Sequence, residues 1–193
     1  MKILLALVTL MLWPVIPLFW IPVHLATGVF RRFGRLTYIF ATIFLVPIAY
    51  YIFLNRNLLL AHIITFPPLL SASGLILLLI GSLIHIWTGA LLSPRSLIGI
   101  PEIVTAQEST LIDKGPFAVV RHPTYLAHTM MFAGIFFFTG VAAVGLLTVA
   151  DFIVVNAVVI PLEEKELALR FGEPYQEYMQ RVPRMIPRMP GKH

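Results

Sequence analysis

The chain has 193 residues, of which 59% are hydrophobic and only 12% charged, and its mean hydropathy is +0.89. About a quarter of the residues in a typical soluble domain are charged, so this composition excludes an ordinary water-soluble globular protein. The net charge of +5 suits a membrane face beside anionic lipid, and nucleic-acid binding is disfavoured because acidic residues interrupt the basic clusters.

Long uncharged runs divide the chain into predicted membrane-spanning segments. The runs are continuous, without a period-2 pattern, and approach or exceed the roughly 20 residues that cross a bilayer, which favours helices over a β-barrel. A first helix is expected within 3–27, bent by its prolines, and a second at 36–54. The segment 58–66 is too short to cross and is predicted to be interfacial or partly re-entrant.

The second half of the chain supplies the remaining predicted spans. A third span is expected at about 68–92. The last apolar run has Gly140 near its middle, which predicts a hairpin of two short helices at 123–139 and 141–162. The sequence therefore predicts an all-α, polytopic integral membrane protein with about five transmembrane helices.

Basic residues gather on one predicted side of the membrane. Five spans place the loop 31–35, the loop 93–122 and the tail from Glu163 on the same side. These segments contain three, three and six of the 14 Lys and Arg, whereas the other side keeps only Lys2 and Arg56. By the positive-inside rule the rich side is cytoplasmic, so we expect a cell-membrane protein whose functional loop and tail face the cytoplasm.

The most informative motif is GPFAVVRHPTY at 115–125. Pro123 suits the first position of a helix, so Arg121 and His122 are expected at its positive end, where backbone donors can hold a carboxylate or phosphate. Tyr125 can add a ring face and a hydroxyl. An ordinary interfacial anchor explains these residue types equally well.

A second, acidic motif ends the last predicted span. At helical spacing, Asn156, Glu163 and Arg170 fall on nearly one stripe that runs from inside the membrane to its edge. We therefore interpret Glu163 as functional. Glu164 and Glu166 are interpreted as a solvated helix end with i,i+4 pairs such as Glu166 to Arg170.

Other polar residues are given structural interpretations. Asp151, near mid-span, is expected to be a neutral acid hydrogen-bonded between helices, close to His85 or His128. No metal is expected, because cysteine is absent and no His spacing typical of a metal site is present. An apolar stripe predicts a short helix lying on the bilayer surface or over the loop; its residues are Phe171, Tyr175, Tyr178 and Val182.

Together these motifs resemble the isoprenylcysteine carboxyl methyltransferase family over roughly residues 85–188. The strings that carry the resemblance are Gly-Pro-Phe…Arg-His-Pro-Thr-Tyr (115–125), Glu-Glu-Lys-Glu-Leu (163–167), Phe-Gly-Glu-Pro-Tyr-Gln-Glu-Tyr (171–178) and Val-Pro-Arg (182–184). The size is similar to that of a prokaryotic member with a minimal helix set. We therefore expect one methyltransferase domain over 1–193, in which 1–66 supplies N-terminal helices and 68–188 the catalytic core.

The resemblance implies an S-adenosylmethionine cofactor in a pocket formed by the cytoplasmic loop and the C-terminal helix. By position, His122 and Tyr125 would hold its amino-acid part, and Phe117 and Ser109 to Ile112 would line its adenosine. The implied cofactor-binding residues are Ser109, Thr110, Leu111, Ile112, Phe117, Arg121, His122, Pro123, Tyr125 and Glu163. The expected catalytic residues are Glu163, Arg170 and Asn156.

One departure from the family pattern concerns the substrate carboxylate. Eukaryotic members carry an arginine about one turn before the glutamate, where this chain has Val159-Ile160. Either Arg170 or Arg121 substitutes for that arginine, or the substrate differs.

The sequence thus predicts a methyltransferase acting on the carboxylate of an S-isoprenylated cysteine or a similar prenyl or lipid acid within the membrane. Three alternatives remain open at this point. They are a phospholipid N-methyltransferase, an NADPH-dependent sterol-type membrane reductase and a non-catalytic membrane scaffold.

Overall fold

The computed structural model describes residues 1–34, 36–92 and 110–187, which are helical apart from loops and a single β-bridge. The helices in chain order are α1 (Lys2–Leu12), the π-helix η1 (Ile16–Trp20), α2 (Ile21–Leu25), α3 (Thr27–Phe33), α4 (Leu36–Leu54), α5 (Arg56–Leu59), α6 (Pro68–Leu91), α9 (Pro116–Val119), α10 (Pro123–Thr139), α11 (Ala142–Val154), the π-helix η2 (Val155–Val159), α12 (Ile160–Phe171) and α13 (Glu173–Arg181).

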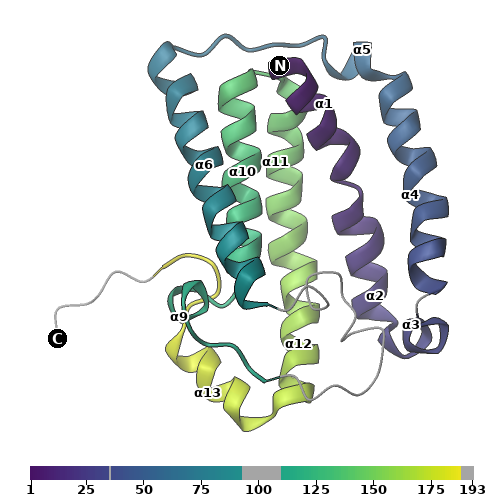
Figure 1. Ribbon diagram of the computed structural model, residues 1–193, viewed down its shortest axis with the longest axis vertical. Coiled ribbons are helices and arrows are strands. Elements are labelled where there is room, and N and C mark those ends of the chain that lie inside the picture. The colour runs from purple at the N-terminus through teal and green to yellow at the C-terminus, as the bar shows by residue number, and fades with distance from the viewer. Residues whose placement is uncertain (35, 93–109, 188–193) are drawn as a thin grey trace.

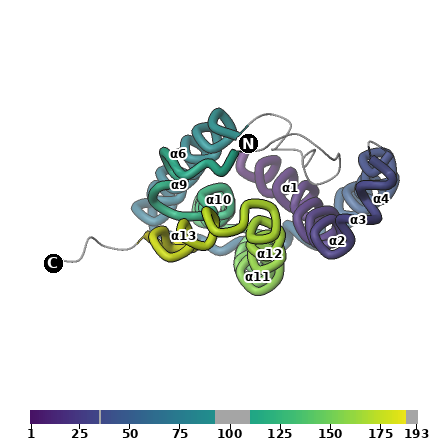
Figure 2. The backbone as a smooth tube through the Cα atoms, turned by 90° about the horizontal axis from the view of Figure 1, so that it is seen from below, coloured from purple at the N-terminus to yellow at the C-terminus, as the bar shows by residue number. Residues whose placement is uncertain are grey.

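Four helical stretches in the described part of the chain are long and apolar enough to cross a membrane: Lys2–Leu25, Leu36–Leu54, Pro68–Leu91 and Ala142–Phe171. The predicted all-α polytopic membrane fold is therefore confirmed. The fourth predicted span, α10, has 17 residues and is slightly shorter than these four. It nevertheless runs through the middle of the bundle, between α6 and α11, whereas α4 stands at the outer edge (Figures 1 and 2).

The two central helices, α6 and α10, approach closely because glycines face each other. A β-carbon added at Gly74 would lie 2.8 Å from the carbonyl oxygen of Gly134, and one added at Gly134 would lie 2.6 Å from that of Gly74. Gly81 meets the backbone of Ala127 in the same way, at 2.8 Å. Small residues allow helices to pack tightly in lipid, where apolar surface alone does not drive association.

The first span is bent where its prolines lie, as predicted. Because proline lacks an N–H group, α1 gives way after Leu12 to a turn containing Pro14 and then to the π-helix η1. The indole N–H of Trp13, next to this bend, donates a 2.9 Å hydrogen bond to Oδ1 of Asp151 on α11. Asp151 therefore is a hydrogen-bonded acid between helices, but its partner is a tryptophan rather than the expected histidine.

The segment after α4 does not cross the bundle. The short α5 is followed by an extended stretch that pairs with the α10–α11 turn: the N–H of Ile64 donates to Gly140 at 2.7 Å, and that of Ala142 to His62 at 2.9 Å. Gly140 ends α10 with φ of +74°, a conformation that favours glycine. The predicted hairpin is confirmed, and its second helix continues nine residues beyond the predicted end at Leu162.

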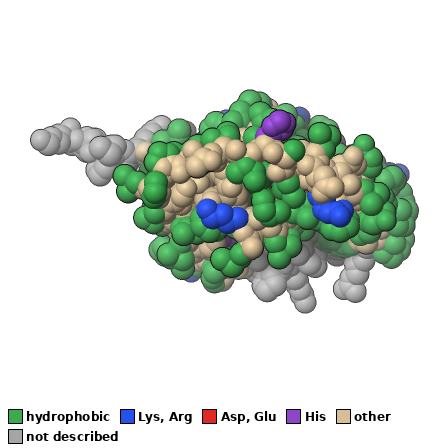
Figure 3. All heavy atoms as spheres, turned by 90° about the horizontal axis from the view of Figure 1, so that it is seen from above, with side chains coloured by type: hydrophobic (Ala, Val, Ile, Leu, Met, Phe, Trp, Pro, Cys, Tyr) green, Lys and Arg blue, Asp and Glu red, His purple; other side chains and the backbone are tan. Residues whose placement is uncertain are grey.

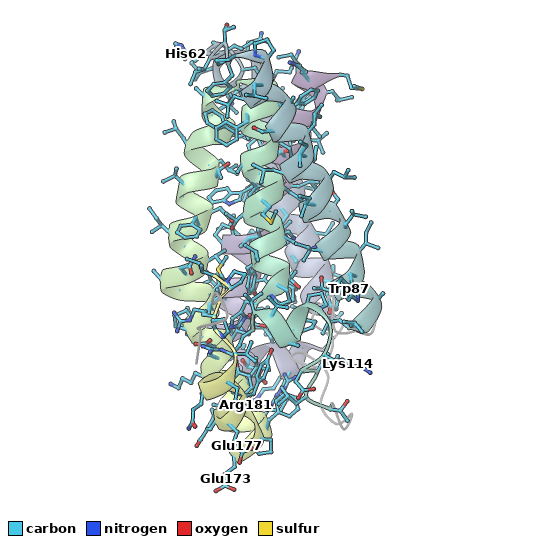
Figure 4. The ribbon with its side chains drawn as sticks, turned by 90° about the vertical axis from the view of Figure 1, so that its left-hand side faces the viewer. His62, Trp87, Lys114, Glu173, Glu177 and Arg181 are labelled. Carbon is cyan, nitrogen blue, oxygen red and sulfur yellow. The ribbon has the colours of Figure 1, made fainter. Side chains whose placement is uncertain are left out.

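Charged side chains lie mainly at one end of the bundle. The helices α3, α9, α12 and α13 share that end, and the N-terminus and α5 lie at the other (Figure 1). From the N-terminal end the visible side chains are mostly hydrophobic, and no acidic side chain is seen among the described residues (Figure 3). Lys114, Glu173, Glu177 and Arg181 lie opposite His62 (Figure 4). The predicted separation of charge is confirmed for the described residues.

We expect Gly134→Ala to destabilise the bundle, because its methyl group would collide with backbone atoms of α6 that cannot move independently. Overpacking of this kind costs about 1–3 kcal/mol, so the thermal unfolding midpoint in detergent should fall. The matched control is Gly28→Ala on α3, where an added β-carbon meets nothing within 4 Å. It should be neutral or slightly stabilising; equal midpoints for the two variants would contradict the close packing of α6 and α10.

Candidate active site

A cavity of about 420 Å³ lies at the charged end of the bundle. Its walls come from η1, α2, α6, α10 and α12, and residues 110–112, α9 and α13 cover it. The volume falls in the range of roughly 300–1,000 Å³ typical of small-molecule sites. Since α6 and α12 belong to stretches that can span a membrane, the cavity is bordered by spanning helices on one side and by a polar loop and α13 on the other.

Most of the predicted site residues meet at this cavity. Those that line it are Thr110, Leu111, Ile112, Phe117, Arg121, His122, Pro123, Tyr125, Glu163 and Arg170. Ser109 lies outside the described residues. Asn156 is not among the described residues of the cavity wall.

The expected stripe of Asn156, Glu163 and Arg170 is wrong because the helix is not a regular α-helix there. Residues Val155–Val159 form a π-turn, which holds more residues per turn and rotates the residues before it relative to those after it. Asn156 instead donates a 2.8 Å hydrogen bond to the carbonyl of Phe152 on its own helix. Glu163 and Arg170, which both come after the π-turn, remain on the cavity wall.

Glu164, interpreted from the sequence as a solvated helix end, is instead buried and central. Its side chain is only 10% exposed. Oε1 accepts hydrogen bonds from Nη2 of Arg121 at 2.7 Å and Nε at 3.1 Å, and Oε2 accepts one from Nη2 of Arg184 at 2.8 Å. The interpretation as a solvated residue is therefore wrong: Glu164 ties α12 to the loop before α10 and to the C-terminal segment.

The C-terminal segment is held against the start of α10 by backbone bonds as well. The N–H of Arg121 donates to the carbonyl of Pro183 at 2.8 Å, and the N–H of His122 to that of Arg184 at 3.0 Å. Nη1 of Arg121 also reaches the carbonyl of Val182 at 2.6 Å. These contacts give the Val-Pro-Arg string a structural role: it fixes the two residues that precede α10.

His122 lies between two carboxylates. Its Nε2 is 3.2 Å from Oε1 of Glu164, its Nδ1 is 3.6 Å from Oε2 of Glu163, and its side chain is only 3% exposed. Burial disfavours the imidazolium, but the interactions with both carboxylates outweigh it and raise the pKa of His122 above its ordinary value. A protonated His122 can therefore hold both glutamates at the cavity.

Glu163 presents a carboxylate to the cavity. Its Oε2 is buried, and its ion pair with Nδ1 of His122, at 3.6 Å, is longer than a hydrogen bond, so this oxygen can accept a further bond. Buried polar atoms are normally satisfied, which makes this oxygen a candidate contact for a ligand. Arg170, on the same wall, pairs with Glu166 at 2.6 Å, as predicted for that i,i+4 pair.

The predicted C-terminal helix lies over the loop. Tyr175, Tyr178 and Val182 form a small buried cluster against α12 and Leu111. The hydroxyl of Tyr178 donates a 2.6 Å hydrogen bond to the carbonyl of Phe117. Burial raises the pKa of Tyr178 to about 12, so the hydroxyl keeps the proton that this bond requires. The helix α13 thus closes the outer side of the cavity.

The inner end of the cavity carries histidines to which sequence reasoning assigned no functional role. His85 on α6 and His128 on α10 lie with ring centroids 4.8 Å apart, and both line the cavity with His24 and Trp20. The Nδ1 atoms of the three histidines are buried and have no hydrogen-bond partner among the described residues. The spacing of His85 and His128 along the chain carries no signal for this pair, because two different helices bring them together.

Comparison with known proteins adds independent information. The sequence profile of the phospholipid methyltransferase family matches residues 69–174. Protein-S-isoprenylcysteine O-methyltransferase B of Arabidopsis thaliana is 30% identical over 137 residues, which cover 66% of this chain and 67% of that protein. The cobalt-zinc-cadmium resistance protein CzcN of Cupriavidus metallidurans is 27% identical over 122 residues, which cover 63% of this chain and 51% of that protein.

The aligned region thus spans about half the length of the Cupriavidus protein and two thirds of the Arabidopsis protein. No solved structure gives a significant match.

We expect Glu164→Gln to loosen the C-terminal segment, because it leaves Arg121 buried without its carboxylate. Breaking a buried ion pair costs on the order of 3 kcal/mol, so trypsin should release the segment after α13 much faster than in the unmodified protein. Glu177→Gln is the matched control, since it removes the same charge from an exposed position on α13 (Figure 4). Equal cleavage rates in the two variants would contradict the role of Glu164.

Proposed function

Because the chain belongs to the phospholipid methyltransferase family, we propose that it transfers a methyl group from S-adenosylmethionine to a lipophilic carboxylate, that of an S-isoprenylated cysteine or a similar prenyl or lipid acid. The proposed site is the cavity around Glu163, in an integral protein of the cell membrane. The gathering of basic residues at the same end supports a site that faces the cytoplasm.

The observation that carries this proposal is one cavity bordered on one side by a polar loop and α13 and on the other by helices long and apolar enough to span a membrane. A water-soluble cofactor needs the first, and a lipid acceptor needs the second. Oε2 of Glu163 and the buried hydroxyl of Tyr175, neither of which has a hydrogen-bond partner among the described residues, fit the polar groups of such a cofactor. Phe117 and Leu111 fit its adenine ring, and His122 and Tyr125 its amino-acid part.

S-adenosylmethionine supplies, when bound, a methyl group on a positively charged sulfur. The carboxylate of Glu163 offsets that charge during binding, and the apolar wall excludes water from the acceptor. The acceptor carboxylate needs no general base, since its pKa is about 3.5. Transfer of the methyl group to this carboxylate would remove one positive and one negative charge, so a dry site would not oppose the reaction. Alignment in the cavity can contribute up to roughly 7–11 kcal/mol.

Arg170 is the better of the two arginines for holding the acceptor carboxylate. Arg121 is already committed to Glu164 and to the carbonyls of Met179 and Val182. Arg170 lies on the cavity wall, and its pairing with Glu166 keeps the guanidinium at the cavity edge. Asn156 has no part in the proposed site, because the π-turn leaves it outside the cavity wall.

The second candidate function is N-methylation of an aminophospholipid, and the pair of His85 and His128 favours it. An ammonium group has no lone pair and must lose a proton before it can attack a methyl carbon. A neutral imidazole nitrogen can accept that proton. The buried Nδ1 atoms of the two histidines, at the inner end of the cavity, are suitable acceptors.

We expect Glu163→Gln to weaken S-adenosylmethionine binding by about tenfold, since attraction between unit charges about 4 Å apart is worth roughly 1–4 kcal/mol near a protein surface. S-adenosylhomocysteine, whose sulfur is neutral, should bind the variant almost as tightly as it binds the unmodified protein. Isothermal titration in detergent measures both affinities.

His122→Ala should abolish micromolar binding of S-adenosylhomocysteine, while His62→Ala, at the opposite end of the bundle, should not affect it (Figure 4). Binding of NADPH in place of both adenosyl ligands would overturn the proposal and support a membrane reductase. If Glu163→Gln weakens the binding of both adenosyl ligands equally, Glu163 does not interact with the positively charged sulfur.

The acceptor class is decided by methyl transfer to a panel of prenylcysteines, fatty acids and aminophospholipids in detergent or nanodiscs. For a carboxylate acceptor we expect a rate that changes little between about pH 5 and pH 8 and survives His128→Phe. Transfer to an aminophospholipid with a rate that falls steeply at acid pH and is lost in His128→Phe would instead establish the second candidate. Absence of transfer to every acceptor would favour a non-catalytic scaffold.

A further inference from the structure

A second cavity, of about 490 Å³, lies on the outer side of the α2–α12 contact. One wall is the end of α2 with the following α3, and the other is one face of α12. Arg170 and His24 line both this cavity and the proposed active site, so the two lie back to back. Apart from Arg170, no residue of the outer cavity has a role in the proposed methyl transfer.

The charge of the outer cavity is positive. Its lining residues include three cations, Arg31, Lys165 and Arg170, and one carboxylate, Glu166. Glu166 is already held by Arg170, with Oε1 2.6 Å from Nη2. Arg31 and Lys165 come from opposite walls, and both side chains are exposed. Two cations that face a common space attract an anion, and a phosphate can bridge both.

The other lining residues are three leucines, Leu25, Leu162 and Leu169, together with His24 and Thr27. Leu25 is the last residue of the first spanning stretch and Leu162 belongs to the last one. Leu25 is 66% exposed and Leu169, on the same face of α12 as Lys165, is 81% exposed. Exposed leucines beside basic side chains are unfavourable in water but match the boundary between headgroups and acyl chains.

We propose that this outer cavity binds the headgroup of an anionic phospholipid. The phosphate contacts Arg31 and Lys165, and an acyl chain runs along Leu25 and Leu162. A lipid is favoured over a soluble anion because the cavity joins the positive end of the bundle to its apolar surface. The bound lipid lies against the opposite side of Arg170 from the active site. Lipid binding in the outer cavity does not require methyl transfer in the active site, and each can be tested without the other.

The test is retention of lipid by the full chain in mild detergent, measured by native mass spectrometry with dioleoylphosphatidylglycerol and dioleoylphosphatidylcholine. We expect retention of the anionic lipid only. The double variant Arg31→Gln/Lys165→Gln should weaken that retention roughly 10- to 30-fold, since each basic residue near anionic lipid contributes about a fivefold factor. Lys114→Gln/Arg181→Gln, which removes the same charge at the same end of the bundle, should leave retention unchanged (Figure 4).

Equal retention of both lipids would overturn the proposal by showing that the lipid's charge is not recognised. Equal loss in both double variants would overturn it in favour of diffuse surface charge. Displacement by millimolar inorganic phosphate would show an anion site rather than a lipid site and would also overturn it. If the double variant has a lowered unfolding midpoint, the single variant Lys165→Gln, with an exposed side chain, carries the same test with a loss of about fivefold.

Discussion

The structure depends most on the bonds of one buried carboxylate, Glu164. It joins a membrane helix, the loop before α10 and the C-terminal segment, which are distant in sequence. Each of its partners would be costly to bury alone, since an unpaired charge in a low-dielectric region is strongly disfavoured. Paired together, they hold His122 against Glu163 at the edge of the cavity. The two neighbouring glutamates thus have different roles. Glu164 holds three segments of the chain together, and Oε2 of Glu163 can accept a hydrogen bond from a ligand.

The membrane bundle supplies the second constraint. Facing glycines bring α6 and α10 together in the apolar region, and the same helices carry His85 and His128 at the inner end of the cavity. A site of this kind has one wall made of spanning helices and another made of a loop and α13. It suits a reaction between a soluble cofactor and a membrane-bound acceptor, because each reactant approaches through the medium in which it is stable. The family to which the chain belongs is consistent with that division.

Arg170 lies on the wall between the two cavities. The proposed active site is on one side of it and the positively charged outer cavity on the other, and its ion pair with Glu166 stands at their common wall. The turn before Glu163 has only aliphatic residues and offers no arginine for the acceptor carboxylate. Arg170, one helical segment later on α12, lies on the cavity wall and is the proposed substitute. The proposed lipid site and the proposed active site therefore share Arg170 as a wall residue.

The sequence by itself determined the spanning segments, the hairpin at Gly140 and the separation of charge, because hydropathy, helix length and glycine conformation are local properties. It also identified the loop and helix that meet at the cavity, through motifs whose residue types suit a cofactor. Three features needed the tertiary structure. The π-turn at 155–159 removed Asn156 from the stripe, because a helical register assumes a constant period. Glu164 became buried because partners from two other segments compensate its charge, and His85 came together with His128 because two helices cross there. The burial of Glu164 and the pairing of the histidines depend on contacts between distant segments, which no local pattern encodes.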